Sequence, residues 1–395
     1  MTARANNIFR QVANNRLALI FTLLVLSEFV YKICIKEYFH AFKISAALKI
    51  VLQLYFVIQI LRNDIKKLWP VVLLTTIFLL GQVGFVSWEQ LKHNAWFLDK
   101  YLFIILTLLY VQTIKDIEKY YPLFFKVFEI FIIVNSICIL LGLVLPTDWF
   151  NTYYGNHNRF GLDGLILRSG AATYIYWIAL YYFVTECFIL KKKKYFQLIL
   201  VAVASLLLGT KAMFIGYVFL AGYLFIYWRG YKNVWMVITI LILLVIGLFF
   251  IDEVLYLLIE NSPSFQAVYE ENGIWSVVFS LREQHLLEEM LPLMQEKWTW
   301  RNYLFGGGFN MHFRSQFGLL DLFYFFGVVG TVAYLFIFGK LFCTFKKNRT
   351  TNLFLLGTFV LMAFSANFFY ETILAFHLVL IKGYFETIND YYETD

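Results

Sequence analysis

Long apolar runs recur along the whole chain, and they constrain its fold more than any other feature of the sequence. About twelve of these runs come close to the roughly 20 residues that an α-helix needs to cross the hydrocarbon core of a bilayer. The pattern predicts an all-α polytopic integral membrane protein with about 12 transmembrane helices, because helices satisfy their backbone hydrogen bonds internally in lipid. The predicted spans are residues 17–34, 44–61, 69–88, 96–114, 122–145, 171–190, 195–209, 212–228, 234–251, 316–340, 352–370 and 372–387.

The composition excludes a soluble alternative. Apolar residues make up 61% of the 395 residues and charged residues 15%, against roughly 45–50% and 25% in soluble domains. A soluble globule of this length lacks the interior to hide so much apolar surface from water. The four cysteines lie in or beside apolar runs, so they predict no disulfide framework. The net charge of +7 indicates membrane orientation and not nucleic-acid binding.

The distribution of lysine and arginine predicts the orientation. With a cytoplasmic N-terminus, nineteen of the 33 Lys and Arg residues fall on the inner side and nine on the outer side. Every inner loop is then short and basic, as the positive-inside rule requires, and both termini are predicted to be cytoplasmic. The first span, 17–34, is long and has no small-residue cleavage site, so it is predicted to be a retained helix and not a signal peptide.

Two outer connections are longer than the others, and the second of them divides the chain into three parts. Residues 1–251 hold the first nine predicted spans, including an outer loop at 146–170. Residues 252–315 form a large outer loop, and residues 316–395 hold the last three spans and the cytoplasmic C-terminus. Long loops in compact proteins are usually functional or disordered, so these two loops are where function is expected.

The large outer loop carries a helical pattern. Ser280 and Glu283 have the spacing of a capping box that would start a helix. This helix is predicted to be amphipathic and to lie on the membrane or cap the bundle. Apolar residues share one of its faces: Leu286, Leu287, Met290, Leu291 and Met294.

Three cations on the predicted outer side are candidates for phosphate binding. Arg282 lies in the first turn of the predicted helix, where unpaired N–H groups and a guanidinium suit phosphate oxygens; the alternative is a solvated loop arginine. Arg168 precedes the sixth span, and the alternative is a side chain that snorkels to the interface. Lys211 follows an apolar run of about 15 residues, which covers only ~22 Å. Its turn is therefore predicted to lie below the membrane surface, where ionisable groups are functional by default; the alternative is local thinning of the bilayer.

An acidic residue lies inside the tenth predicted span. Asp321 follows Arg314 by seven residues, which places both on nearly the same face of a helix. A carboxylate at this depth is expected to face the bundle or a wet cavity, with a purely structural ion pair as the alternative. Gly306-Gly-Gly308 has no following Gly-Lys-Ser/Thr, so it predicts a sharp turn and not a nucleotide loop. The outer histidines do not have the spacing of a metal site: His157, His285 and His312.

Four short motifs carry a resemblance to a known family. They are, in order, Gly209-Thr-Lys211-Ala, Ser280-Leu-Arg282, Leu304-Phe-Gly-Gly-Gly308 and Leu320-Asp321-Leu-Phe-Tyr-Phe-Phe-Gly327-Val-Val-Gly330. In this order and spacing, the chain resembles the O-antigen ligase/polymerase superfamily and is most similar to Wzy-type polymerases of O-antigen or capsular repeat units. The resemblance covers roughly residues 150–340. The His-Asn pair that ligases often carry near this point is absent, although His312 lies close, and this favours a polymerase.

The resemblance implies a metal-independent, inverting glycosyltransferase without a cofactor, which acts on the outer side of a bacterial inner (cytoplasmic) membrane. Its donor would be a glycan on undecaprenyl pyrophosphate, and its acceptor a single repeat unit on the same carrier within the membrane lipid. A chain-length regulator protein is a further implied partner, and nucleic acid is not one.

The resemblance also implies roles for individual residues. Fixed cations would neutralise the pyrophosphate leaving group in place of a metal ion. A base would draw the proton from the attacking sugar hydroxyl. The implied pyrophosphate ligands are Arg168, Lys211 and Arg282, with Arg314 and Arg159 in support, and the implied base or acceptor-orienting group is Asp321 or His312.

Two other functions remain as alternatives: an O-antigen ligase that transfers glycan to lipid A core, and a polysaccharide transporter or flippase. Transporters tend to have two similar halves and helices broken by Gly or Pro within the membrane. The sequence shows no such repeat, and its five prolines lie at the ends of predicted spans or in the large loop. The sequence therefore predicts unbroken spans and favours an enzyme.

Overall fold

The computed structural model describes residues 11–38, 43–83, 87–145, 148–152, 160–250, 253, 256, 259–260, 263–307, 311–364 and 368–392. Throughout these residues the regular structure is helical, and the β-bridge between Asn151 and Leu162 stands outside any strand. The predicted all-α class is therefore confirmed. Arg159 lies outside the described residues, as does the side chain of His312.

Among the described residues, seven helices are long and apolar enough to cross a membrane. They are Arg16–Lys36, Ile44–Asn63, Ile65–Gln82, Trp88–Val111, Tyr121–Leu141, Ser169–Ile189 and Gly318–Phe342. Shorter apolar helices match further predicted spans at Tyr195–Leu206, Lys211–Tyr227 and Arg349–Ala363. The chain is thus a multi-pass helical protein by length and composition, and the number of twelve spans stays a prediction.

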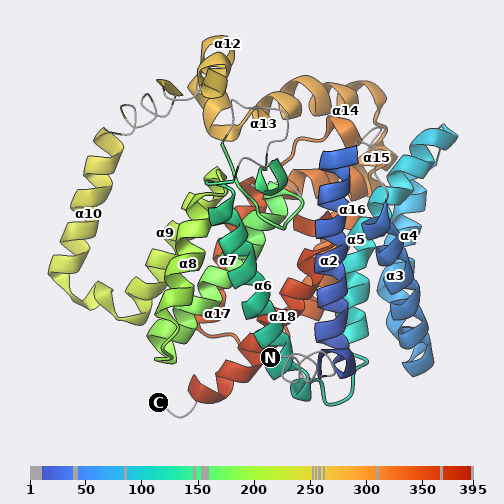
Figure 1. The fold of residues 1–395 in the computed structure, drawn as a ribbon. Helices are drawn as coiled ribbons and strands as arrows, with labels where there is room; N and C mark the ends of the chain where they lie inside the picture. The colour runs from blue at the N-terminus through green and yellow to red at the C-terminus, as the bar shows by residue number, and fades with distance from the viewer. Residues whose placement is uncertain are drawn as a thin grey trace.

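The long helices run up and down, and all of them except α10, which stands apart from the others, form one bundle (Figure 1). They are α2 (Arg16–Tyr38), α3 (Ile44–Asn63), α4 (Trp69–Gln82), α5 (Trp88–Val111), α6 (Tyr121–Leu141), α7 (Ser169–Val184), α8 (Tyr195–Leu206), α9 (Lys211–Tyr227), α10 (Val234–Phe249), α16 (Gly318–Phe342), α17 (Arg349–Phe364) and α18 (Leu374–Tyr392). The segment 263–307 lies across one end and forms α12 (Pro263–Phe279), α13 (Arg282–Gln284), α14 (Leu291–Lys297) and α15 (Trp300–Phe305). We name this the loop end, and the opposite end, where α2 begins and α18 ends, the terminal end.

Burial separates central helices from peripheral ones. Every residue of α7 from Ala171 to Val184 is buried, whereas apolar residues of α3 and α10 are exposed, with Val51 at 60% and Leu241 at 55%. A helix that is apolar on all sides is either buried in protein or faces lipid. The exposed apolar surface of the peripheral helices is therefore the surface suited to lipid.

Glycines fix the junction of α4, α15 and α16. Gly306 and Gly307 have positive φ angles of 75° and 101°, which confirms the predicted sharp turn at these two residues. A Cβ on Gly306 would lie 2.2 Å from the carbonyl oxygen of Phe325, and one on Gly307 would lie 2.2 Å from that of Gly81. The three backbones therefore touch at a distance that only glycine permits.

The helix α16 is broken at Gly327, where φ is 66° and ψ is −172°. The turn after α15 fills this break: the Gly307 N–H donates to the Phe325 carbonyl at 3.2 Å, and a Cβ on Gly327 would lie 2.4 Å from the backbone nitrogen of Gly306. The prediction of unbroken spans is therefore wrong here. Its physical cause is a tertiary contact with the turn after α15, which the apolar sequence around Gly327 does not reveal.

The start of α13 also differs from the prediction. Ser280 and Leu281 both have positive φ, and α13 begins after Leu281 without a side-chain cap, so the predicted capping box of Ser280 and Glu283 is wrong. The Ser280 hydroxyl instead accepts a hydrogen bond from Lys211 at 3.1 Å. A different capping box forms at the start of α15.

The predicted amphipathic face is interrupted by a π-helical turn, η6 (His285–Met290), which precedes α14. Met290 and Met294 are buried as predicted, whereas Leu287 is 60% exposed. A π turn holds more residues than an α turn and so rotates the following side chains. The predicted face is therefore only partly formed.

The orientation can be tested with single cysteines in a background where the four native cysteines are replaced by alanine. Glu271 and Lys193 are both exposed, and they lie at the loop end and the terminal end, respectively. We expect Glu271→Cys to react with an impermeant thiol reagent added outside intact cells, and Lys193→Cys to react only after the membrane is permeabilised. The reversed pattern would overturn the orientation.

Candidate functional site

A lysine of α2 binds the loop that precedes α7. Lys32 is buried and donates to the carboxylate of Asp163 and to the carbonyl oxygens of Gly164 and Ile166, the last two at 2.6 and 2.8 Å. Each acceptor lies within five residues of Arg168, where α7 begins. The buried ammonium therefore fixes the chain that positions Arg168.

Lys36, one turn further along α2, holds the earlier part of the same loop. Its ammonium donates to the carbonyl oxygens of Asp148 and Asn151, the second at 2.5 Å. Burial raises the pKa of Asp163 to about 6, and Lys32 and Lys36 oppose this rise. The loop of residues 148–166 is therefore held by lysine side chains at both of its ends.

Arg168 forms an ion pair with Glu371, which precedes α18. Its Nη1 lies 3.1 Å from Oε1 of Glu371. The Glu371 side chain is 8% exposed and that of Arg168 is 43% exposed. Glu371 raises the pKa of Arg168, and so the guanidinium stays charged while part of it remains accessible.

Further cations gather around Tyr370. The guanidinium carbon of Arg314 lies 5.5 Å from the centre of the Tyr370 ring, and the ammonium of Lys100 lies 5.7 Å from it. Lys100 also lies 3.8 Å from the centre of the Trp96 ring, within cation–π distance. Lys100 interacts electrostatically with Arg168, Arg314 and Glu371. We name the following residues the outer cation cluster, after their place toward the loop end of the bundle: Lys100, Arg168, Arg314, Tyr370 and Glu371.

Two more acidic residues flank the outer cation cluster. Glu28 accepts hydrogen bonds from Lys49 and from the Ser45 hydroxyl, the second at 3.0 Å. Asp99 interacts electrostatically with Lys100 and Lys49. The acids and cations of this region therefore nearly balance, and the cations are held in place by protein groups.

Asp321 lies in the first turn of α16 and is 1% exposed. Its Oδ1 accepts from the Ser315 hydroxyl at 2.9 Å and from the Gln316 backbone N–H at 3.1 Å. Its Oδ2 lies 3.9 Å from Nε of Arg314. The predicted proximity of Arg314 and Asp321 is confirmed, but the predicted reason is wrong: α16 begins at Gly318, so a turn and not a shared helix face brings Arg314 back.

Lys211 is the first residue of α9 and contacts the end of α12. Its ammonium donates to the carbonyl oxygen of Val277 and to the hydroxyl of Ser280. The last carbonyls of a helix have no partner within the helix and carry partial negative charge, which the ammonium compensates. A hydrogen bond of 2.9 Å between Thr173 and Thr210 places the start of α9 beside the start of α7.

The predicted phosphate ligands thus occupy three places. Arg168 and Arg314 belong to the outer cation cluster, Lys211 lies against the end of α12, and half-buried Arg282 opens α13. All lie toward the loop end of the bundle. In the described part of the chain, no three His, Cys, Asp or Glu side chains are grouped as a metal ion would require.

Three members of the outer cation cluster were not predicted as site residues. Lys100 lies four residues after Trp96 in a predicted span, and a lysine at membrane depth beside an aromatic ring is a usable signal. Glu371 is the single residue between two predicted spans, and Tyr370 precedes it. Their association with Arg168 and Arg314 depends on the packing of α5, α7 and α16, which no local pattern encodes.

Comparison of the chain with protein-family models, with curated proteins and with solved structures finds no match. Function is therefore inferred from the residues themselves and from where the fold brings them.

Proposed function

We propose that this chain is a multi-pass membrane glycosyltransferase that polymerises oligosaccharide repeat units carried on undecaprenyl pyrophosphate, in the synthesis of O-antigen or capsular polysaccharide. The reaction would take place at the loop end, on the outer side of a bacterial inner membrane. One observation carries the proposal: Lys100 and Arg314 lie over the ring of Tyr370, and Arg168, paired with Glu371, interacts electrostatically with Lys100.

This arrangement suits the chemistry of a pyrophosphate leaving group. Negative charge develops on the leaving oxygen when the anomeric carbon is attacked, and preorganised cations stabilise that charge most effectively at a site with little water. The adjacent starts of α7 and α9 add partial positive charge. Arg168 offers a planar fork for two phosphate oxygens, whereas Lys211 acts as a point charge.

An exposed aromatic ring beside the outer cation cluster suits the sugar part of the substrate. Trp96 is 47% exposed and presents a flat apolar face beside the ammonium of Lys100. Asp321 or His312 would draw the proton from the attacking hydroxyl or orient the acceptor. For Asp321 the acting oxygen would be Oδ2, because Oδ1 already accepts hydrogen bonds from Ser315 and Gln316.

The decisive experiment is reconstitution of the purified chain into liposomes with synthetic undecaprenyl-pyrophosphate-linked repeat units. We expect longer lipid-linked glycan to form and to form equally in EDTA, since fixed cations replace a metal ion. Transfer of glycan to added lipid A core would identify a ligase, and movement of the substrate across the bilayer without a new bond would identify a flippase. Either of those results would overturn the polymerase proposal.

Variants of Arg168 and Lys211 test the proposed charge stabilisation. We expect Arg168→Ala and Arg168→Lys to lose activity to a similar extent, because lysine keeps the charge but not the planar fork. Lys211→Arg should keep substantial activity and Lys211→Met should not. The expected loss is about 10²–10³-fold in rate, or about 2.7–4 kcal/mol of transition-state stabilisation.

A matched control is available at the same end of the bundle. Arg301 of α15 is exposed, and Arg301→Ala should polymerise at the rate of the unmodified chain. Thermal unfolding of every variant in detergent separates the proposed role from a structural one. Loss of activity that is matched by an equal loss of folded protein would mean that these cations only hold the fold together.

The broken helix α16 is a feature that also occurs in transporters. In transporters such breaks expose backbone to a substrate cavity. In this chain the break is instead filled by the turn after α15, and the Phe325 carbonyl is satisfied by the Gly307 N–H. A break that is closed by the protein backbone gives no support to a transport pathway at this point.

A further inference from the structure

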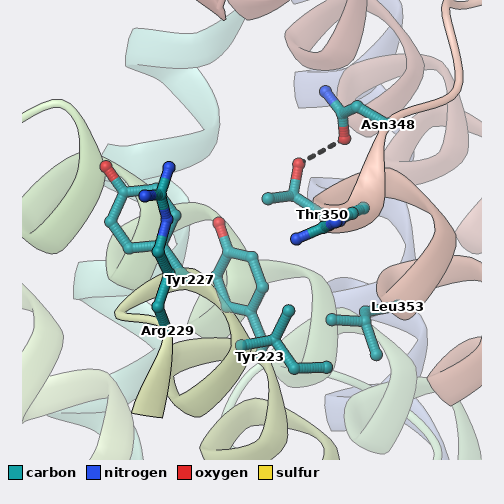
Figure 2. A pocket seen from close by; sticks show the side chains of 8 residues that line it. Tyr223, Tyr227, Arg229, Asn348, Thr350 and Leu353 are labelled. Carbon is teal, nitrogen blue, oxygen red and sulfur yellow. Dashed lines mark hydrogen bonds between the residues drawn. The ribbon is translucent and has the colours of Figure 1, made fainter. Parts of the chain in front are cut away.

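A cavity of about 280 Å³ is lined by residues at the end of α9 and the start of α17 (Figure 2). These two helix ends lie at the terminal end of the bundle (Figure 1), opposite the end that holds the outer cation cluster. The cavity lies between the last turn of α9 and the first turn of α17. Figure 2 shows Tyr227 and Arg229 on one side of the cavity and Asn348 and Thr350 on the other. A second arginine, Arg349, also lines it.

The two segments that line the cavity are strongly basic. Residues 223–236 and 345–356 contain no Asp or Glu. The cations within them are Arg229, Lys232, Lys346, Lys347 and Arg349. Such an imbalance beside a cavity favours an anionic ligand.

A nearby carboxylate does not neutralise these arginines. Tyr223, which lines the cavity, is hydrogen-bonded to Thr185, and the next residue is Glu186. Glu186 is 1% exposed and is already paired with Lys192 and Lys194 at 2.9 Å each. The positive charge at the cavity is therefore not cancelled by this acid.

The backbone at the cavity also favours an anion. Asn348 caps α17: its Oδ1 accepts from the Thr351 backbone N–H at 2.8 Å and from the Thr350 hydroxyl at 2.5 Å. The other amides in the first turn of a 16-residue helix have no partner within the helix and carry partial positive charge. Across the cavity, Arg229 has a left-handed backbone (φ 55°) that ends α9 in a fixed turn.

Exposed aromatic residues locate the cavity at the level of lipid headgroups. Trp228, Tyr231 and Trp235 are 52%, 45% and 79% exposed. Tryptophan and tyrosine concentrate where the hydrocarbon core meets the polar headgroups. The cavity is also lined by apolar side chains, among them Ile226 and Leu353. Arginines beside apolar side chains match a lipid that carries a phosphate group.

We propose that this cavity binds a phosphate-bearing anion through Arg229, Arg349 and the first turn of α17. The ligand chemistry is a phosphate mono- or diester, which either an anionic phospholipid headgroup or a small soluble phosphate can supply. Basic pockets between transmembrane helices on the cytoplasmic side commonly bind anionic lipid headgroups in this way. The site is independent of the proposed polymerase reaction, which involves the opposite end of the bundle.

The test measures ligand retention by native mass spectrometry of the full chain, released from nanodiscs of phosphatidylcholine with one tenth phosphatidylglycerol. We expect the unmodified chain to retain phosphatidylglycerol over phosphatidylcholine. The variant Arg229→Gln/Arg349→Gln should bind it about 30-fold more weakly, because each cation near the surface contributes about a fivefold effect. The matched control Arg62→Gln/Lys66→Gln removes two exposed cations at the same end and should bind as the unmodified chain does.

A second arm distinguishes the two sources of phosphate. The same proteins are titrated with glycerol 3-phosphate in phosphatidylcholine nanodiscs. Retention of the lipid with no binding of the soluble ester identifies a lipid site, and binding of the soluble ester that depends on both arginines identifies a small-molecule site. The proposal would be overturned if the Arg62→Gln/Lys66→Gln control lost ligand binding to the same extent. It would also be overturned if Arg229→Gln/Arg349→Gln retained phosphatidylglycerol and glycerol 3-phosphate as the unmodified chain does.

Discussion

Replacing Gly327 by alanine is expected to destabilise the bundle by about 2–6 kcal/mol. Two costs add at this position. The positive φ of Gly327 strains any residue that has a Cβ, and the added methyl would lie 2.4–2.5 Å from backbone atoms of Leu304 and Gly306. Backbone atoms cannot rotate away as a flexible side chain would, so α15 and α16 would have to separate.

The same helix supplies the control. Gly339 lies in the second half of α16, and a Cβ there would meet nothing within 4 Å. Gly339→Ala should leave stability unchanged or raise it by up to about 1 kcal/mol, because alanine favours the helix. The measurements are the monodisperse fraction after mild detergent extraction and the midpoint of thermal unfolding. If Gly327→Ala and Gly339→Ala behave alike, the junction is not held as described.

Replacing Lys32 by methionine is expected to cost about 3–5 kcal/mol, because it leaves a buried carboxylate without its cation. Lys32 and Asp163 are both buried, with side-chain exposures of 2% and 1%. The substitution also removes the donor to the carbonyl oxygens of Gly164 and Ile166. Unfolding in detergent at pH 7 measures the effect.

The double variant Lys32→Met/Asp163→Asn tests whether the charge pair is the cause. Removing both charges should cost less than the sum of the two single substitutions, with a coupling of about 0.5–3 kcal/mol. Lys43→Met, at an exposed lysine near the same end, should have almost no effect. Strict additivity of the two single substitutions would show that Lys32 and Asp163 do not stabilise each other.

The predicted helices follow from physics that acts locally. A run of apolar residues at membrane length must form a helix, so α2, α3 and α6 begin within one residue of their predicted starts. The apolar pattern does not predict the start of α5 at Trp88, because the first two turns of this helix are polar, with Glu89, Lys92 and His93. A composition window cannot recognise a helix that projects beyond the apolar layer.

The site was less predictable because tertiary contacts assemble it. Arg168 was identified from its position before a span, but its partner Glu371 is 203 residues away. The spacing of Ser280 and Glu283 predicts a helix cap, yet the Ser280 hydroxyl accepts a hydrogen bond from Lys211 of α9. Local spacing predicts which groups are available for hydrogen bonding, and the packing of distant helices decides which of them pair.

The segment 263–307 is held at two points, at the end of α12 and after α15. Lys211 holds the last turn of α12, and the glycine junction locks the turn after α15 into α16. The chain between these two contacts is fixed at both of its ends and cannot move aside as a lid does. For the proposed reaction, a substrate with a long lipid tail would therefore reach the cations laterally from the bilayer, between helices. Its tail would stay in the hydrocarbon core, and its sugars would lie beneath this immobile segment.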